Sequence, residues 1–85
     1  MDIKLADENL RKMREALGLT VPAAAAEMNL SAATLARYEK GAFVKFEKLW
    51  PAARFYGVYL ADLISENCLN TFYDVLDNPQ RHRQG

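Results

Sequence analysis

Apolar residues recur at intervals of three and four along most of the chain, which is the spacing of helices with one buried face. In the first such segment the repeating residues are Leu10, Met13 and Leu17. Asp7 can cap the start of this helix, and Gly18 can supply the left-handed residue that ends it. The pattern therefore predicts a first helix over 7–17.

A second, shorter helix is predicted directly afterwards. Thr20 is a favourable N-cap, and Pro22 falls in the first turn, where its missing N–H costs little. The alanines from 23 to 26 favour helix, which continues to Met28.

A tight turn and a third helix come next. Asn29 tolerates the left-handed conformation, Leu30 can plug the junction from inside, and Ser31 can cap the following helix. This third helix is predicted over 32–40, and Gly41 is expected to end it.

These two short helices are predicted to meet at a steep angle. Ala25 faces the third helix where the pair approach most closely, and Leu35 and Tyr38 give that helix one apolar face. The residues left to face outward are Ala32, Ala33, Thr34, Ala36 and Arg37. The segment 20–41 thus has the outline of a helix-turn-helix, a shape that fits the DNA major groove.

The chain beyond this segment is rich in aromatic residues, namely Phe43, Phe46, Trp50, Phe55, Tyr56 and Tyr59. Pro51 predicts either a kink or a late start of a fourth helix. The residues expected to point inward are Leu49, Ala53 and Tyr56. Gly57 ends this helix, and a short fifth helix is expected over 60–64. Since so small a core cannot hide every ring, Phe43, Phe46 or Tyr59 is expected to remain exposed as part of a contact surface.

The segment 67–78 carries a last apolar repeat, made of Leu69, Phe72, Tyr73 and Leu76. An isolated helix of this length does not persist in water, so it either folds back on its own domain or binds another subunit. We favour the second alternative and predict that these four residues form a dimer interface. Residues 79–85 are expected to be a flexible tail, in which the RHR triplet is either a disordered end or an extra DNA contact.

Composition agrees with a small all-α protein, a compact bundle of about five short helices. The 85 residues fit one domain, and a domain of this size often gains stability from a partner subunit. Eleven Lys and Arg residues equal eleven Asp and Glu residues, so the overall basic charge typical of nucleic-acid binders is missing. DNA binding must therefore rest on local clustering of charge.

Chemistry other than binding has little support in these residues. His82 lies in the polar tail, without the rigid neighbours that a catalytic base or metal ligand needs, and no cofactor motif such as GxGxxG is present. We therefore predict no enzyme activity, no cofactor and no metal. Cys68 is expected to be a half-buried structural thiol, which suits a cytoplasmic protein, and no apolar stretch reaches the length that a membrane requires.

The run LRKMREALGLTVPAAAAEMNLSAATLARYEKG, continued by KLWPAARFYGVYLADL, resembles the lambda-repressor-like (Cro and C1, or XRE-like) helix-turn-helix family. The resemblance implies a DNA-binding domain over 1–66, in which Leu63 closes the core. It also implies an ion pair between Arg14 of the first helix and Glu39 at the end of the third.

The same resemblance implies which residues would contact DNA. Base contacts fall on Ser31, Ala32, Ala33, Thr34 and Arg37, and backbone contacts on Thr20, Val21, Lys40, Lys45 and Lys48. Several of these depart from the family pattern, since Val21 often corresponds to a polar residue and Ala32 and Ala33 to Gln, Arg, Lys or Asn. An alanine can touch a thymine methyl but cannot read guanine, so direct readout falls largely on Thr34 and Arg37. Arg37 is expected to reach a base or a phosphate, the alternative being a solvated helical arginine.

Two functions remain open after these observations. The first is a sequence-specific, dimeric, bacterial or phage regulator that binds double-stranded DNA and represses a promoter. The second is a protein-interaction module, such as an antitoxin or anti-regulator, that uses its aromatic and C-terminal surface to bind a protein partner. Neutral charge and the alanines of the third helix favour the second, whereas the Ser31 cap, Arg37 and the lysines favour the first.

Overall fold

Five α-helices and two short 3-10 helices make up the computed structural model, which describes residues 4–42 and 45–77. The elements are α1 (Lys4–Ala16), α2 (Val21–Glu27), α3 (Ala32–Tyr38), η1 (Phe46–Leu49), α4 (Trp50–Tyr56), η2 (Leu60–Ile64) and α5 (Cys68–Asp77). No strand occurs in these ranges. The protein is all-α, as the sequence predicts.

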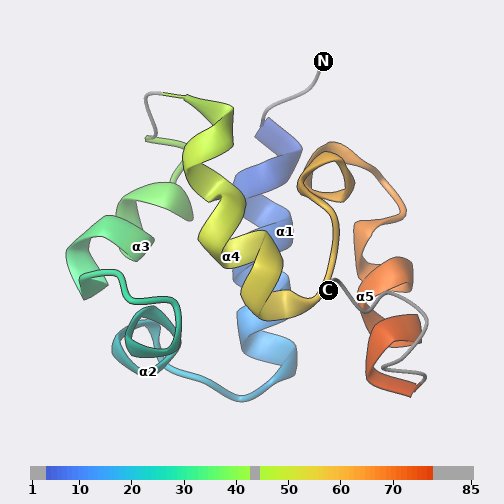
Figure 1. Cartoon of the computed structure of the whole chain (residues 1–85), viewed down its shortest axis with the longest axis horizontal. Helices are drawn as coiled ribbons and strands as arrows, with labels where there is room; N and C mark the ends of the chain where they lie inside the picture. Colours follow the sequence, from blue (N-terminus) through green and yellow to red (C-terminus); the bar gives the residue numbers. More distant parts are fainter. Residues whose placement is uncertain (1–3, 43–44, 78–85) are drawn as a thin grey trace.

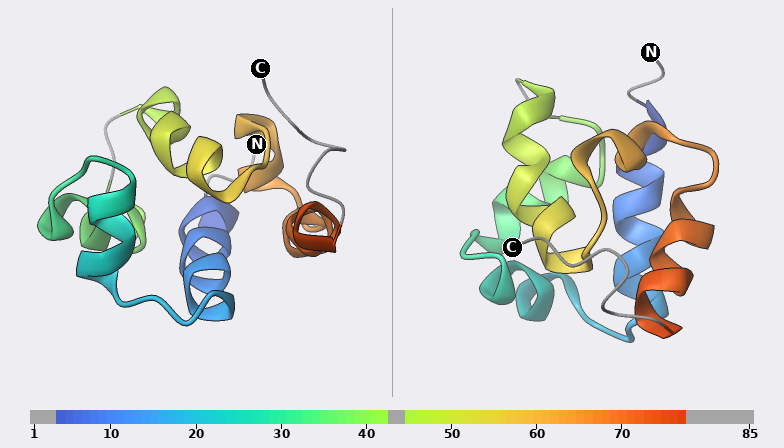
Figure 2. Two further views of the ribbon diagram at one scale, coloured as in Figure 1. Left: turned by 60° about the horizontal axis from the view of Figure 1, so that its bottom comes forward. Right: turned by 45° about the vertical axis from the view of Figure 1, so that its right-hand side comes forward.

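The helices form a bundle with α1 and α4 at its centre (Figure 1). Helices α2 and α3 lie on one side of this pair, and α5 lies on the opposite side, an arrangement that the two further views also show (Figure 2). Helix α2 packs mainly on α3, while α1 packs on η2 and α5. The helix-turn-helix and the C-terminal helix are therefore separate outer parts of one small bundle.

The core lies where these layers meet. Its largest fully buried side chains are Phe72, Leu10, Met13, Leu35, Leu49, Leu63, Val58 and Cys68. Because α1, α3, α5 and both 3-10 helices each contribute to this list, burial of one continuous apolar cluster holds the outer parts to the centre.

The first helix begins earlier than its sequence pattern predicts. Ala6 is fully buried one turn before Leu10, so the buried face of α1 extends toward the N-terminus and the helix starts at Lys4. Asp7 is therefore not the N-cap but an acidic residue of the first turn, where its negative charge interacts favourably with the helix dipole. At the other end, Leu17 follows the last helical residue and is 38% exposed, so the prediction that it faces inward is wrong.

A buried polar contact joins α1 to the end of η2. The side-chain amide of Asn9 donates to the backbone carbonyls of Leu63 at 2.8 Å and Ser65 at 3.2 Å. Asn9 is the only buried polar residue among the described positions, and these two bonds satisfy its donors. These bonds hold the C-terminal end of η2 against α1.

Pro51 lies in the first turn of α4, so of the two alternatives predicted for this helix, a kink or a late start, the structure has the late start. The residues expected to point inward, Leu49, Ala53 and Tyr56, are all buried. Of the aromatic residues expected at the surface, Tyr59 is 52% exposed, Phe46 packs partly against the core, and Phe43 lies outside the described residues.

Helix α5 corrects our prediction of the dimer interface. Phe72 is 1% exposed and stands edge-on to the Tyr56 ring, with centroids 5.8 Å apart, and Leu69 also packs against the core. The apolar face of α5 thus folds back on its own domain, because α1 and η2 leave an apolar surface that it covers. Tyr73 and Leu76 remain outside, each 48% exposed.

Cys68, at the start of α5, is fully buried rather than half-buried. Burial raises the pKa of its thiol to about 12, with a smaller contribution from the charge of Asp62. The thiol is therefore held in its unreactive protonated form and serves packing.

Two glycines in the left-handed conformation provide a test of the packing of α5. Gly18 (φ +71°) has open space where a Cβ would stand, whereas at Gly57 (φ +79°) a Cβ would lie 2.9 Å from Cγ1 of Val75. We expect Gly18→Ala to lower the free energy of unfolding by about 1 kcal/mol through backbone strain alone. Gly57→Ala should add a further loss of about 1–3 kcal/mol, because it overpacks the contact with α5.

Urea unfolding of both variants measures this difference. In a Val75→Ala background the clashing methyl is gone, so Gly57→Ala should cost no more than Gly18→Ala does. Equal costs in the natural background would mean that α5 does not pack against this turn.

Candidate nucleic-acid interface

Helix α2 is fixed at its start by a local cap. The Thr20 side chain accepts a hydrogen bond from the backbone N–H of Ala23 at 3.2 Å, and Pro22 occupies the first turn. Ala24 and Ala25 are buried, which lets α2 approach its neighbours closely. These features follow the sequence prediction.

The turn between α2 and α3 depends on Asn29, whose φ of 58° is the only positive value at a non-glycine residue in the described ranges. This left-handed residue brings the backbone N–H of Leu30 back to the carbonyl of Ala25, at 2.9 Å. Leu30 then packs its side chain partly against the core. The chain thereby reverses within three residues and projects α3 outward.

Ser31 caps α3 and starts a row of hydrogen bonds along its outer face. Its Oγ accepts from the backbone N–H of Thr34 at 3.1 Å and donates to the Thr34 hydroxyl at 2.8 Å. A guanidinium nitrogen of Arg37 donates to the same hydroxyl oxygen at 3.4 Å. Because the Thr34 oxygen accepts from both neighbours, its own hydrogen is available to donate outward.

The outer face of α3 is open to solvent. Ser31, Ala32, Ala33 and Arg37 are exposed, and Thr34 is partly exposed, while Leu35 is fully buried on the inner face. The helix ends at Tyr38 rather than at residue 40, since the chain turns toward Gly41 at φ +80°. The predicted base-contacting residues therefore share one exposed surface.

An ion pair anchors this helix to α1. The Arg14 guanidinium donates from Nε to Oε2 of Glu39 at 2.8 Å and from Nη2 to Oε1 at 3.0 Å. A third bond, from Nη1, reaches the backbone carbonyl of Leu19 at 2.8 Å. With side chains only 14% and 7% exposed, the pair is shielded from water, and the hydrogen bond to Glu39 raises the pKa of Arg14 against the opposing effect of burial.

Tyr56 lies close enough to this pair to feel its charges. Its hydroxyl is buried and has no hydrogen-bond partner among the residues that the structure describes. Burial raises its pKa above the ordinary tyrosine value, and the Glu39 charge acts in the same direction. The phenol therefore stays neutral beneath the ion pair.

The predicted backbone-contacting residues are spread over a wider area. Thr20, Lys40, Lys45 and Lys48 are exposed, whereas Val21 packs its side chain partly against the core, so that only its backbone N–H is suited to a phosphate. Lys45 and Lys48 lie at the start of and within η1, which follows α3 on the side of the bundle away from α5 (Figure 1).

Comparison with protein families matches residues 8–66 to the family described as helix-turn-helix domain. This match covers more than half of the chain. The chain belongs to the helix-turn-helix domain family. Membership of this family supports a DNA-binding role, and members of the family are typically not enzymes. No curated protein and no solved structure is significantly similar to the chain.

A metal site and a membrane-spanning helix are both absent from the described ranges of this helix-turn-helix protein. No group of three or more His, Cys, Asp or Glu side chains there is arranged to hold a metal ion. None of the helices in these ranges is both long enough and apolar enough to cross a membrane.

Two features of the interface were not predicted from the sequence. The Ser31, Thr34 and Arg37 side chains are spaced three apart, and this spacing could have predicted their hydrogen-bonded row. The bond from Arg14 to the Leu19 carbonyl left no such signal, because its acceptor is a backbone atom whose position depends on the folded loop.

The ion pair gives a direct test of how α3 is held. Glu39→Gln should lower the free energy of unfolding by about 2–4 kcal/mol, since it leaves the Arg14 charge shielded from water without its counter-charge. Glu47→Gln, which removes an exposed carboxylate from η1, should change stability by less than about 0.5 kcal/mol. Urea denaturation measures both.

A double variant separates pairing from packing. Arg14→Met combined with Glu39→Leu should recover most of the stability lost by Glu39→Gln, because no unpaired charge remains. If Glu39→Gln lowers stability no more than Glu47→Gln does, the ion pair is not what fixes α3 on α1.

Proposed function

We propose that this protein is a sequence-specific DNA-binding transcription regulator that inserts α3 into the major groove. The observation that carries this proposal is the exposed row of Ser31, Thr34 and Arg37 on the second helix of a helix-turn-helix. Polar side chains on that helix are what a groove-reading module presents to base edges.

Each residue of α3 has a distinct proposed role. Arg37 donates to a guanine edge or a phosphate, and the outward hydroxyl hydrogen of Thr34 donates to a base acceptor. Ser31 contacts the edge of the groove, while Ala32 and Ala33 pack against thymine methyl groups. This set favours an A·T-containing site with one guanine near Arg37.

Phosphate contacts hold the domain in register on the duplex. We assign them to the exposed lysines Lys40, Lys45 and Lys48 and to backbone N–H groups at Thr20 and Val21. With about 3–4 phosphates neutralised per subunit, one domain binds a half-site weakly and loses affinity quickly as salt rises.

A symmetric dimer would supply the missing affinity. Of the four residues predicted at an interface, Tyr73 and Leu76 are the exposed ones, and we assign the contact to them. Helix α5 lies across the bundle from α3 (Figure 2), so a contact through it leaves the DNA-binding surface uncovered.

Within its family, we place the protein among the lambda-repressor-like, Cro and C1 or XRE-like regulators of bacteria or phages. The resemblance to these regulators implies an ion pair between Arg14 and Glu39, and these two side chains do form a salt bridge. A cytoplasmic repressor of this kind acts by occupying promoter DNA, without a cofactor or a catalytic step.

One observation favours a second function. Ala32 and Ala33 are exposed at the start of α3, where they offer no hydrogen bond to a base, and the chain carries no net positive charge. A protein-interaction module, such as an antitoxin or anti-regulator, would keep the fold under these conditions while losing DNA affinity.

DNA titration distinguishes the two functions. The protein is titrated with duplex from upstream of its own coding region and with random duplex, at two salt concentrations, using a fluorescent label on the DNA. We expect tighter binding to the upstream duplex and a loss of affinity with salt. Arg37→Ala should weaken binding to that duplex by about 10-fold or more, since a good base contact contributes about 1–3 kcal/mol.

Arg11→Ala is the matched control, because it removes the same charge from an exposed position on α1. It should leave the preference for the upstream duplex unchanged. Equal and negligible binding of the unmodified protein to both duplexes would reject the regulator and leave the interaction module.

The dimer contact is tested by analytical ultracentrifugation. Leu76→Glu should shift the protein toward monomer, because it places a charge in the apolar contact, and it should weaken binding to a two-fold symmetric site. Leu17→Glu, at an apolar residue also exposed but outside α5, should leave the association unchanged. A monomer in the unmodified protein, at the concentrations that saturate DNA, would exclude this interface.

A further inference from the structure

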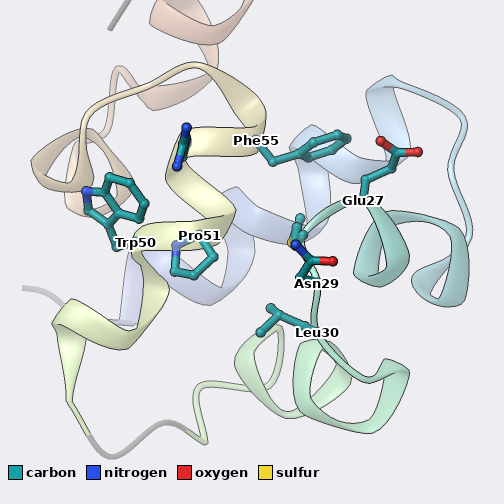
Figure 3. A pocket seen from close by; sticks show the side chains of 8 residues that line it. Glu27, Asn29, Leu30, Trp50, Pro51 and Phe55 are labelled. Carbon is teal, nitrogen blue, oxygen red and sulfur yellow. The ribbon is translucent and has the colours of Figure 1, made fainter. Parts of the chain in front are cut away.

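A groove lies between the turn of the helix-turn-helix and α4, and no residue of α3 lines it (Figure 3). Its accessible volume is about 640 Å³. One wall is formed by Met28, Asn29 and Leu30 of the turn, and the other by Pro51 and Phe55 of α4. This volume falls within the range of about 300–1,000 Å³ that small-molecule sites occupy.

Five of the eight residues that line the groove are apolar, and polar atoms form almost as much of its walls as apolar atoms do. Figure 3 shows Pro51 and Phe55 on α4 opposite Asn29 and Leu30 on the turn, with Trp50 at one end of the space. Trp50 is 48% exposed, which is unusual for so large an apolar ring in a small domain. These walls offer burial to an apolar or aromatic body.

Two charged side chains also line the groove, Arg54 from α4 and Glu27 from the end of α2. The Arg54 guanidinium lies over the Trp50 ring, 5.3 Å from its centroid. Within the residues described, neither Arg54 nor Glu27 has a hydrogen-bonded or ionic partner. The Trp50 ring therefore makes a cation–π contact with Arg54, and the N–H groups of Arg54 are available to a ligand.

We propose that this groove is a binding site for a small amphipathic carboxylate. The carboxylate pairs with Arg54, whose planar guanidinium can donate two parallel hydrogen bonds to it. The apolar body of the ligand lies between Phe55 and Pro51 on one side and Leu30 on the other. Arg54 is the only cation among the eight lining residues, so a second carboxylate would meet Glu27 without a partner, which favours a monocarboxylate.

The size of the groove decides between a small molecule and a macromolecule. Eight residues line it, whereas a stable protein partner contacts about 20–30 residues on each side. Arg54 favours an anionic ligand over a cationic one, because its guanidinium contacts the Trp50 ring. Within the described part of the chain, Glu27 makes no such contact with an aromatic ring. A small apolar molecule with a single carboxylate fits both the size of the groove and the charge of Arg54.

Phenylbutanoate is a suitable probe, with the neutral phenylbutanamide as its matched control. Trp50 is the only tryptophan, so its emission reports on the groove directly. We expect phenylbutanoate to change this emission saturably, with a dissociation constant on the order of 1 mM, as is usual for so small a ligand. It should also shift the backbone amide resonances of Asn29, Leu30 and Phe55 and raise the unfolding temperature.

Charge recognition is tested on the full chain by variants and by the neutral probe. Arg54→Gln should weaken phenylbutanoate binding about 5- to 10-fold, Arg54→Lys should restore part of it, and Arg11→Gln should have no effect. Phenylbutanamide should bind about as weakly as phenylbutanoate binds to the Arg54→Gln variant. Amide shifts measure affinity in each case, because loss of stacking also alters Trp50 emission.

The following outcomes would overturn the proposal. One is the absence of saturable shifts at the turn and α4. Another is equal binding of the acid and the amide, which would show adventitious apolar contact only. A third is shifts that cluster at Tyr73 and Leu76 instead of the groove. None of these measurements contains DNA, so their result is independent of the function proposed above.

Discussion

The position of the whole helix-turn-helix depends on one guanidinium. Arg14 donates to both carboxylate oxygens of Glu39 and to the carbonyl of Leu19, so a single side chain on α1 holds the end of α3 and the loop that precedes α2. Shielding makes this arrangement selective rather than simply stabilising, because any packing that separates the charges leaves one of them without compensation. The apolar core holds the helices together, while the ion pair adds a contact that requires the end of α3 to lie beside Arg14 of α1.

This anchoring lies entirely on the inner side of α3, which explains how a complete scaffold can carry an unusual outer face. Leu35 and Glu39 meet the rest of the domain, whereas Ala32, Ala33 and Arg37 contact none of its core. Substitution at the outer positions therefore costs the fold little. The alanines at these positions therefore change the chemistry of the outer face of α3 without changing where α3 lies.

Local signals in the sequence predicted this part of the fold well. Thr20 and Ser31 cap their helices with bonds to residues three positions away, and Asn29 takes the left-handed conformation, all of which depend on neighbours in the chain. Predictions failed where distant residues decide. The spacing of Phe72 showed an apolar face but not whether its own domain or another subunit would cover it, and Ala6 gave no sign that burial would extend α1 beyond Asp7. The Asn9 contact was missed for the same reason, since its acceptors lie more than fifty residues away.

The candidate DNA-binding surface and the groove share the same turn. The backbone N–H of Leu30 donates to the carbonyl of Ala25 in the turn between α2 and α3. The Leu30 side chain packs partly on the core and also lines the groove. A molecule seated between Leu30 and α4 would contact the residue from which α3 departs. Leu30 and Glu39 thus lie at the two ends of α3, one packed on the core and the other paired with Arg14. The two contacts together determine the direction in which Thr34 and Arg37 project.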